Sequence, residues 1–242
     1  MADSHVDFMV VSAHPDDAEV QMGGTIVKLV RKGMRGVLID LCDGEPSDFD
    51  APGERVKQAQ RAAEILGVER ILLPFQDRMI QDTIEIRLAV AREIRRLRPR
   101  TVFSTAAACV HPDHEAMEPI ARAAVFYARL KHWDRVPGGE ALADSEPWEV
   151  DRLFFPHCKL EPVWGDFAFA VDVSETYGLK QRALAEYRSI FKVDEGDRLL
   201  DLYEAEDAHM GRLAGVRYAE IFRAHSPLVV DDPTSFLPGV HA

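Results

Sequence analysis

The sequence of 242 residues is poor in cysteine and has no excess of positive charge. Its three cysteines are odd in number and form no C-x-x-C pair, so we expect no disulfide framework and a reducing cytoplasm fits. The 29 lysines and arginines are dispersed and are outnumbered by 41 acidic residues, for a net charge of -12. Because phosphate binding needs a concentrated basic surface, we expect no nucleic-acid partner.

Long apolar runs are also missing. The first apolar run has only the length of a strand, and Met1–Asp7 carries acid where a signal peptide would carry base, so neither an export signal nor a membrane span is expected. The pattern G-x-G-x-x-G is absent as well. Gly23-Gly24 falls inside a predicted helix, where close packing explains it better than a phosphate loop. Nucleotide binding is therefore the least favoured alternative.

Short apolar runs alternate with longer amphipathic segments, which is typical of a parallel sheet covered by helices. With 47% hydrophobic residues the chain can bury one core. We predict a three-layer, Rossmann-like α/β fold with an open, mostly parallel sheet, and one domain over 1–242. Its core spans about 6–190, and a helix and short strand form a small C-terminal extension over about 191–242. The predicted strands span 8–12, 37–41, 70–73, 102–105, 153–155, 167–173 and 218–222. The predicted helices span 17–32, 54–66, 83–97, 113–129, 174–189 and 197–213.

Three local features of these segments carry predictions of their own. Ser174 is the expected N-cap of its helix. The arginines of the third helix are expected on a solvated face rather than in a phosphate site. Residues 131–148 contain glycine and proline, and we expect them to form a mobile lip over the functional site.

A histidine and two carboxylates follow the first predicted strand directly. The stretch Ala13-His14-Pro15-Asp16-Asp17 comes after Val10-Val11-Ser12, so it lies at the carboxyl end of a strand. Open α/β proteins bind their ligands at this edge of the sheet. Imidazole and carboxylate groups can hold a cation, and a further carboxylate can act as a base.

A second cluster, His111-Pro112-Asp113-His114, follows another predicted strand about a hundred residues later. Metal sites often combine ligands close in sequence with one from a distant loop, because one tight turn rarely supplies a closed coordination sphere. We therefore predict His14, Asp17 and His114 as ligands of a divalent cation. Such a cation lowers the pKa of a bound water from about 15.7 to roughly 7 and polarises a substrate carbonyl.

Adjacent Asp16 and Asp17 point in different directions, which allows them different roles. We predict that Asp16 accepts a proton from the attacking water, a contribution of about 10²- to 10⁴-fold in rate. His111 need not bind the metal and can stabilise an oxyanion or protonate the departing amine. One alternative is that Asp16 merely caps the following helix. Another is a non-haem iron oxygenase, because two histidines and one carboxylate also form its facial triad.

The two clusters resemble the motifs of the PIG-L family of N-acetylglucosaminyl deacetylases, also called the LmbE-like family. The first cluster, with Glu19 and Gly23-Gly24-Thr25, is similar to the opening motif of the family, and His111-Pro112-Asp113-His114 is similar to its second motif. Weaker similarities are Asp43-Gly44-Glu45, Arg55 ahead of Ala62–Gly67, and Arg98-Pro99. The resemblance spans at least residues 6–130.

This resemblance implies a zinc-dependent hydrolase that removes an N-acyl group, N-acetyl in the first instance, from an amino-sugar conjugate. Zn²⁺ is the expected cofactor, with Fe²⁺ or another divalent metal as the alternative, and the expected partner is a small-molecule amino-sugar conjugate. Another amide hydrolase activity on the same scaffold stays open, and a homo-oligomer is compatible with the sequence. The implied residues are His14, Asp17 and His114 as metal ligands, Asp16 as general base, His111 as acid or oxyanion partner, Asp113 as the residue that orients His111, and Arg55 as a substrate contact.

Two positions depart from the family pattern. Cys109 stands two residues before the second motif, where many members carry an acid. The segment Leu73–Asp77 inserts residues where a shorter Pro-Asp is common. We therefore expect the surroundings of His111 and the choice of substrate to differ from those of other members.

Overall fold

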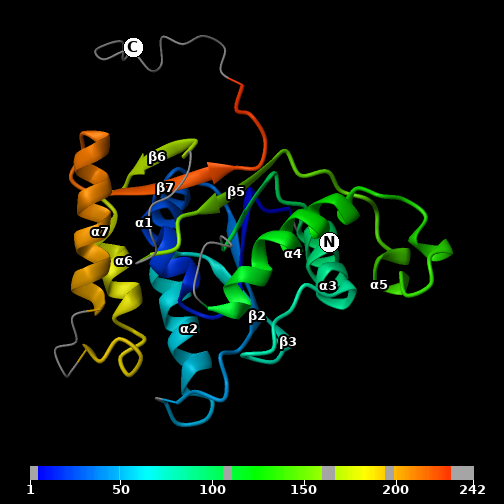
Figure 1. Cartoon of the computed structure of the whole chain (residues 1–242), viewed down its shortest axis with the longest axis horizontal. Coiled ribbons are helices and arrows are strands. Elements are labelled where there is room, and N and C mark those ends of the chain that lie inside the picture. The colour runs from blue at the N-terminus through cyan, green and yellow to red at the C-terminus, as the bar shows by residue number, and fades with distance from the viewer. Residues whose placement is uncertain (1–4, 49, 106–110, 160–166, 194–198, 230–242) are drawn as a thin grey trace.

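The computed structural model describes residues 5–48, 50–105, 111–159, 167–193 and 199–229, and it shows an α/β fold (Figure 1). The predicted class, with an open and mostly parallel sheet, is confirmed. The strands are β1 (Phe8–Ser12), β2 (Gly36–Cys42), β3 (Glu69–Phe75), β4 (Thr101–Ser104), β5 (Arg152–Pro156), β6 (Phe169–Asp172) and β7 (Ala219–Ala224). The helices are α1 (Asp17–Arg31), α2 (Glu54–Leu66), α3 (Ile84–Leu97), α4 (Pro112–Ala128), α5 (Glu140–Ala143), α6 (Tyr177–Leu184) and α7 (Leu199–Ala214), with a 3-10 turn at Trp133–Arg135.

Strand β1 lies inside a seven-stranded sheet of order β3-β2-β1-β4-β5-β7-β6. Strands β1 to β5 pair in parallel, and β7 pairs antiparallel with both β5 and β6. The chain runs outward from β1 to β3 and then returns to the other side of β1 with β4. Ligands of open α/β sheets bind at the carboxyl ends of the strands where the strand order reverses. The two clusters, which come after β1 and β4, therefore lie at one crevice.

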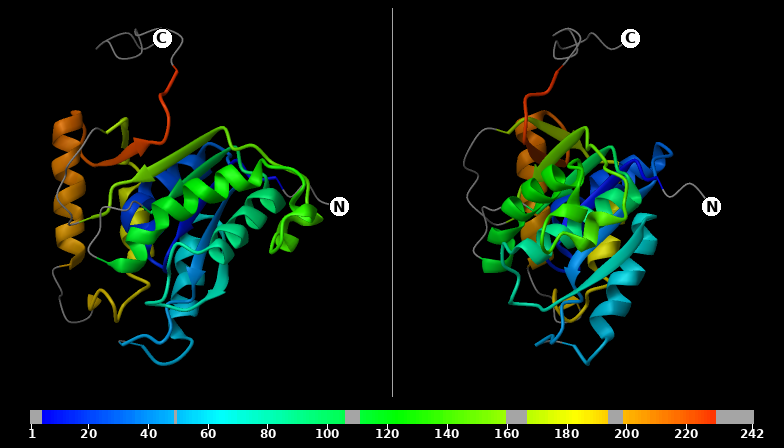
Figure 2. Two further views of the ribbon diagram at one scale, coloured as in Figure 1. Left: turned by 45° about the vertical axis from the view of Figure 1, so that its right-hand side comes forward. Right: turned by 90° about the vertical axis from the view of Figure 1, so that its right-hand side faces the viewer.

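Helices cover both faces of the sheet (Figure 2). Alternation of side chains along the strands divides the core into one layer on each face. Met9 and Val11 of β1 pack with α3 and α4, whereas Phe8 and Val10 pack with α1, α2 and α6. Successive side chains of a strand point to opposite faces, so a strand covered on both faces must be apolar throughout. Every residue of β1 is buried, which explains its unbroken apolar run.

Helix α1 is broken at Met22, whose φ of -148° and ψ of 23° are not helical. The carboxylate of Glu220 on β7 accepts hydrogen bonds from the backbone N–H groups of Gly24 (3.0 Å) and Thr25 (2.7 Å). It therefore caps the second half of the helix, whose first N–H groups have no helical partner. A Cβ atom at Gly24 would lie 2.7 Å from Val173 Cβ. The glycine pair thus serves close packing, and the phosphate-loop alternative loses the feature that suggested it.

Glu220 belongs to a set of four buried charged side chains. Lys180 Nζ lies 2.7 Å from Asp207 Oδ2 and 2.8 Å from Glu220 Oε1, and Lys159 Nζ lies 2.6 Å from Asp207 Oδ1. Two ammonium groups and two carboxylates compensate one another, as buried charges require. Together they connect α6, α7 and β7 to the broken helix α1.

Replacing Gly24 with alanine is expected to destabilise the protein by about 1–3 kcal/mol, because overpacked sites cost this much. The new methyl group would overlap Val173, whose branched side chain has little rotamer freedom. Gly178→Ala in α6 is the matched control, since its Cβ would meet nothing within 4 Å. Alanine there should stabilise the helix by up to about 1 kcal/mol. Urea unfolding should show shifts of opposite sign, and a stabilised Gly24→Ala variant would contradict the packing role.

The C-terminal elements belong to the main layers of the fold. Strand β7, from the predicted extension, lies inside the sheet between β5 and β6, and α7 packs beside it. Helix α6 begins at Tyr177 and not at the predicted Ser174, whose hydroxyl instead donates to Asp172 Oδ1 at 2.6 Å. Within the described ranges no helix combines the length and apolar character that crossing a membrane requires.

The position of Arg95 in α3 shows that two of the sequence predictions are wrong. It is buried, although the run of arginines is predicted to face solvent. Its guanidinium donates to the backbone carbonyls of Ala128 (2.9 Å) and Leu142 (2.7 Å). These bonds hold the segment 131–148 against α3 and α4, so it forms no lip over the site described below.

Candidate functional site

Two loops at the carboxyl edge of the sheet bring the sequence clusters together. His14 follows β1, and Asp17 is the first residue of α1. His111 is the N-cap of α4, with Nδ1 accepting a hydrogen bond from the backbone N–H of Asp113 at 3.2 Å, and His114 lies in the first turn. Because β1 and β4 are neighbouring parallel strands, the two clusters that come after them lie side by side.

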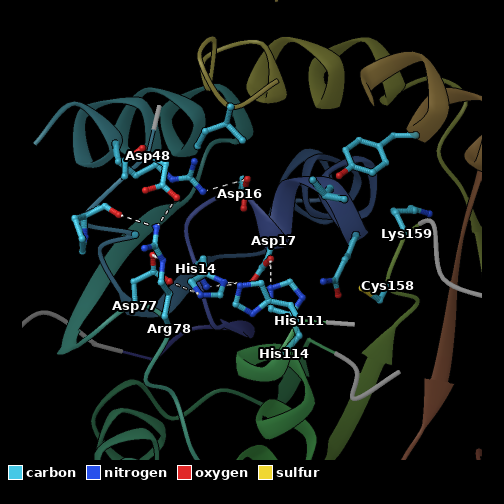
Figure 3. Close-up of a pocket in the computed structure, with 18 residues that line it drawn as sticks. His14, Asp16, Asp17, Asp48, Asp77, Arg78, His111, His114, Cys158 and Lys159 are labelled. Atoms are coloured by element: carbon cyan, nitrogen blue, oxygen red, sulfur yellow. Dashed lines mark hydrogen bonds and ion pairs between the residues drawn. The ribbon is translucent and has the colours of Figure 1, made fainter. Parts of the chain in front are cut away.

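The three predicted metal ligands lie within contact distance of one another (Figure 3). His14 Nδ1 is 3.1 Å from His114 Nε2, which is 3.0 Å from Asp17 Oδ1, and His14 Nδ1 is 3.7 Å from Asp17 Oδ2. Burial alone would raise the pKa of Asp17, but the two imidazoles lower it well below its usual range. A carboxylate and two ring nitrogens at this spacing fit a divalent cation, since zinc binds such donors at about 2.0–2.2 Å.

Two carboxylates lie against the far side of His14. Its Nε2 is 3.0 Å from Asp77 Oδ1 and 3.1 Å from Asp113 Oδ2. If the proton of the ring lies on Nε2, facing these acids, Nδ1 is unprotonated and faces Asp17 and His114. Contacts between a carboxylate and the far nitrogen of a histidine also fix the orientation of a metal-binding ring. Burial disfavours charge on His14, but the surrounding acids outweigh it and raise the pKa of the ring. The surroundings of His14 therefore favour a positive charge, which a bound cation can supply.

The sequence predicts neither the observed partner of Asp113 nor a role for Asp77, and both carboxylates contact His14. The Asp113 carboxylate contacts His14 and accepts a hydrogen bond from the backbone N–H of Arg78 at 2.8 Å, whereas its predicted partner was His111. Only the backbone of Asp113 bonds His111, because N–H groups in the first turn of a helix point back to the cap. Asp77 is not predicted, since a lone acid has no neighbour at ligand spacing. Its position after β3, at the same edge of the sheet, is the signal that identifies it.

His111 lies beside the ligand cluster. Its ring stacks on His114 and packs edge-on against His14, with centroid distances of 4.8 Å in both cases. Burial, together with the charges of His14 and His114, lowers the pKa of His111, which favours the neutral ring. Since Nδ1 accepts a hydrogen bond, the proton of the neutral ring lies on Nε2. His111 can thus donate a hydrogen bond, and its ring nitrogens are also close enough to join the ligands.

Asp16 has a backbone conformation that is rare for a residue with a side chain. Its φ of 104° and ψ of -27° lie outside the regions favoured by non-glycine residues, and strain of this kind is concentrated at functional sites. The carboxylate does not cap α1 and instead lies 3.2 Å from Arg55 Nη2, which contradicts the alternative that Asp16 is only a helix cap. Burial raises the pKa of Asp16 to about 6, although Arg55 opposes the shift. A pKa near neutrality suits a general base.

Arg55, the predicted substrate contact, is buried in α2 and bonds the loop that carries Asp16. Its Nη2 donates to the carbonyl oxygen of Pro15 at 2.6 Å, and its guanidinium lies 5.1 Å from the ring centroid of Tyr187. Arg55 also lines the pocket around the ligand cluster. Its contacts fit a role in orienting Asp16, which the sequence did not predict.

A second group of possible ligands, His14, Cys42 and Asp77, also has donor atoms within 4.8 Å of one another. Burial raises the pKa of the Cys42 thiol to about 12, and its Sγ donates to the carbonyl oxygen of Ala13 at 3.3 Å. The thiolate is the form that binds metals, so this group fits a cation less well than the first. Cys109, which the sequence marked as a departure from the family pattern, lies outside the described residues.

The ligand cluster lines a pocket of about 590 Å³, a size that suits a small molecule. Asp48 and Arg78 lie on one side of the cluster, and Cys158 and Lys159 lie on the other (Figure 3). The arrangement can hold a cation, accept a proton at Asp16 and donate a hydrogen bond from His111. These are the parts needed to hydrolyse an amide or ester.

Comparisons with known proteins show what the sequence and the fold of this chain are similar to. The family model described as PIG-L, GlcNAc-PI de-N-acetylase, matches residues 9–125. The crystal structure of a conserved protein from Thermus thermophilus is 35% identical with a TM-score of 0.82, over 93% of this chain and 97% of that one. Diacetylchitobiose deacetylase of Thermococcus kodakarensis is 29% identical, over 89% of this chain and 81% of the relative. The inhibitor complex of N,N'-diacetylchitobiose deacetylase from Pyrococcus horikoshii, at 24% identity, a TM-score of 0.78 and coverage of 90% and 82%, shares the fold.

Proposed function

Because the chain belongs to the PIG-L family, we propose that it is a metal-dependent hydrolase that removes the N-acetyl group from an amino-sugar conjugate. The observation that carries the proposal is the cluster of His14, Asp17 and His114 donor atoms at 3.0–3.7 Å, with Asp16 beside it. The relative from Thermococcus kodakarensis acts on diacetylchitobiose, a substrate of this class.

Two imidazoles and one carboxylate fit Zn²⁺, which we propose as the metal, and Fe²⁺ accepts a similar donor set. A bound divalent cation supplies Lewis acidity, which polarises the amide carbonyl and makes a water molecule more acidic. The proposed ligands are His14 through Nδ1, His114 through Nε2, and Asp17. Asp77 and Asp113 hold the His14 ring in the orientation that this requires.

The side chains around the ligands divide the proton transfers. Asp16, with a pKa of about 6, is mostly a carboxylate at neutral pH and accepts the proton of the attacking water. It then returns this proton to the amine nitrogen as the C–N bond breaks, which releases the free amine and the acid. Arg55 holds that carboxylate in place through an ion pair at 3.2 Å. His111 donates its Nε2 proton in a hydrogen bond to the carbonyl oxygen, where negative charge develops as the water adds.

Metal analysis of the purified protein, combined with an assay for free amine released from N-acetylglucosamine conjugates, tests the proposal directly. We expect one divalent cation per chain and loss of activity after chelation, restored by Zn²⁺ or Fe²⁺. A protein that binds neither metal, or that stays inert when loaded, would overturn the assignment. Oxygen consumption dependent on a co-substrate would favour the iron oxygenase, although a parallel sheet is not the usual scaffold of those enzymes.

Asp113→Asn is expected to weaken metal binding by about 10- to 100-fold, because ligand-orienting carboxylates contribute this much to metal affinity. The amide still accepts a hydrogen bond from the backbone of Arg78 but loses the charge that favours the proton on His14 Nε2. Asp151→Asn makes the same change in an exposed ion pair with Arg100 and should leave affinity unaltered. Competition with a chromophoric chelator measures both, and equal affinities in the two variants would contradict the role of Asp113.

We also propose that the protein works in the cytoplasm on a small-molecule substrate. Cys42 is a buried thiol, which fits a reducing compartment.

A further inference from the structure

Arg78 adopts a backbone conformation that favours glycine. Its φ is +66°, in the left-handed region, where a side chain costs energy. The turn is needed because the backbone N–H of Arg78 donates to the Asp113 carboxylate at 2.8 Å, and that carboxylate orients His14. Glycine would satisfy this backbone requirement with less strain, so the requirement does not explain the arginine side chain.

The ion pair of Arg78 does not explain the presence of an arginine side chain at this position either. Arg78 Nη2 lies 2.8 Å from Asp48 Oδ2, donates to the carbonyl oxygen of Pro46 at 3.3 Å, and the guanidinium is 3.8 Å from Asp77 Oδ2. The side chains of Arg78 and Asp48 are 53% and 70% exposed. Ion pairs this open to solvent contribute little to stability, so the pair can exchange for another partner at low cost.

Other cations around the pocket are already paired in buried contacts. Among the lining residues that the structure describes, Arg55 is held by Asp16 and Lys159 by Asp207. Arg78 instead lies on the same side of the ligand cluster as Asp48, which is its main contact, and its side chain is exposed (Figure 3). Its planar fork of donors matches the two oxygens of a carboxylate or phosphate.

We propose that Arg78 is a specificity-determining residue that binds an acidic group, a carboxylate or phosphate, carried on the sugar-conjugate part of the substrate. Asp48 competes for the same guanidinium. The assignment rests on the proposed function, since it places the N-acetyl group at the ligand cluster and the acidic group on the side of Asp48. The strained backbone at residue 78 is then retained for the sake of its side chain.

A matched set of substrates tests the charge preference. The carboxymethyl glycoside of N-acetylglucosamine and its carboxamide have nearly the same shape and differ in charge, and N-acetylglucosamine 1-phosphate provides the phosphate arm. For the wild type we expect kcat/KM to favour an acidic substrate over the carboxamide by about 10- to 100-fold, the range of a charged hydrogen bond. A preference in either acidic arm supports the proposal and identifies the group. Equal kcat/KM values for all three would overturn it.

Substitutions at the two residues should shift this preference in opposite directions. Arg78→Gly keeps the backbone N–H and relieves the strained φ, and it should reduce the ratio of acidic to neutral kcat/KM to about 1, mainly through KM. Asp48→Asn removes the competing carboxylate and should increase the ratio. In the Arg78→Gly background, Asp48→Asn should have no further effect. Shifts of the same sign in the two single variants would indicate a general loss of structure and overturn the proposal.

Two controls separate recognition from stability and from net charge. Arg92→Gln removes a positive charge with a matching exposure of 54% from α3, outside the pocket, and should leave the ratio unchanged. The melting temperature of Arg78→Gly should be no lower than that of the wild type, because glycine suits the left-handed turn. If Arg92→Gln lowers the ratio as much as Arg78→Gly, the effect belongs to net charge and the proposal fails.

Calorimetric binding of the deacetylated glycosides keeps the proposal testable without turnover. If no substrate is hydrolysed, the proposed function fails, and binding still tests Arg78. Tighter binding of the acidic glycoside by the wild type, lost in Arg78→Gly, would support its role. Equal binding of the acidic glycoside and its carboxamide would overturn it, even in an enzyme that hydrolyses both.

Discussion

Substitution of Asp16 by asparagine is expected to lower kcat for amide hydrolysis by about 10²- to 10⁴-fold, with metal content unchanged. The amide cannot accept the proton that the carboxylate accepts, whereas the ligand atoms of His14, Asp17 and His114 are untouched. Asparagine also tolerates positive φ better than most residues, so the loop at φ 104° should keep its shape.

Asp17→Asn provides the matched comparison, one residue further along the chain. It removes the charge of a proposed ligand, so it should release metal at chelator concentrations that the wild type and Asp16→Asn withstand. Metal analysis after dialysis and the kcat of metal-saturated protein distinguish the two roles. Equal loss of metal in both variants would show that Asp16 is itself a ligand.

Lys180→Met is expected to destabilise the protein by about 3–5 kcal/mol, because it removes one partner from a buried ion pair. The side chain of Lys180 is 0% exposed and contacts both Asp207 and Glu220, which would lose their shared ammonium group. Lys57→Met, in a pair whose lysine is 67% exposed, should cost under about 1 kcal/mol. Thermal and urea unfolding measure both changes.

A double variant separates uncompensated charge from lost packing. Lys180→Met combined with Glu220→Gln should recover part of the stability, because no unpaired carboxylate is then left at Glu220. If the destabilisation of the double variant equals the sum of those of Lys180→Met and Glu220→Gln, the loss of stability comes from packing and capping alone.

The same four buried charges should make the stability of the folded protein sensitive to acid. Burial would raise the pKa of Asp207, but Lys180 and Lys159 lower it below its ordinary 3.8. A carboxyl group with a lower pKa in the folded state adds stability above its unfolded pKa and loses it as the pH falls through the folded pKa. The wild type should therefore lose this contribution below about pH 4. Lys180→Met, with one ammonium group fewer, should begin to lose it at higher pH, as acid titration of the unfolding midpoint would show.

The sequence predicted the fold and the ligand cluster for the same reason. Buried parallel strands must be apolar on both faces, so β1 and β4 are visible as short apolar runs. His14 and His114 follow such runs, and a parallel sheet places the ends of those runs at one edge. Two clusters about a hundred residues apart thus predicted one site.

Hydrogen-bond partners within the site could not be predicted in this way. Asp113 is close to His111 in sequence and close to His14 in the fold. Which of the two histidines its carboxylate contacts depends on the direction of the Asp113 side chain, which the sequence does not show. Asp77 follows β3 as a single acid, whereas Asp48 is one of several acids in the loop after β2, and most acids on a surface have no such role. Arg95 is buried because backbone carbonyls from a distant segment face it, which periodicity within α3 does not reveal.

The position of β7 has a consequence for synthesis of the protein on the ribosome. This strand enters the sheet between β5 and β6, and its Glu220 supplies the acceptor for two N–H groups of α1. A nascent chain that has emerged only as far as α4 already contains every proposed metal ligand, but it lacks this acceptor. Contacts between residues so far apart in sequence slow folding. We therefore expect the metal to bind tightly only after β7 has joined the sheet, so that metal loading follows folding of the C-terminal elements and does not guide the early collapse of the chain.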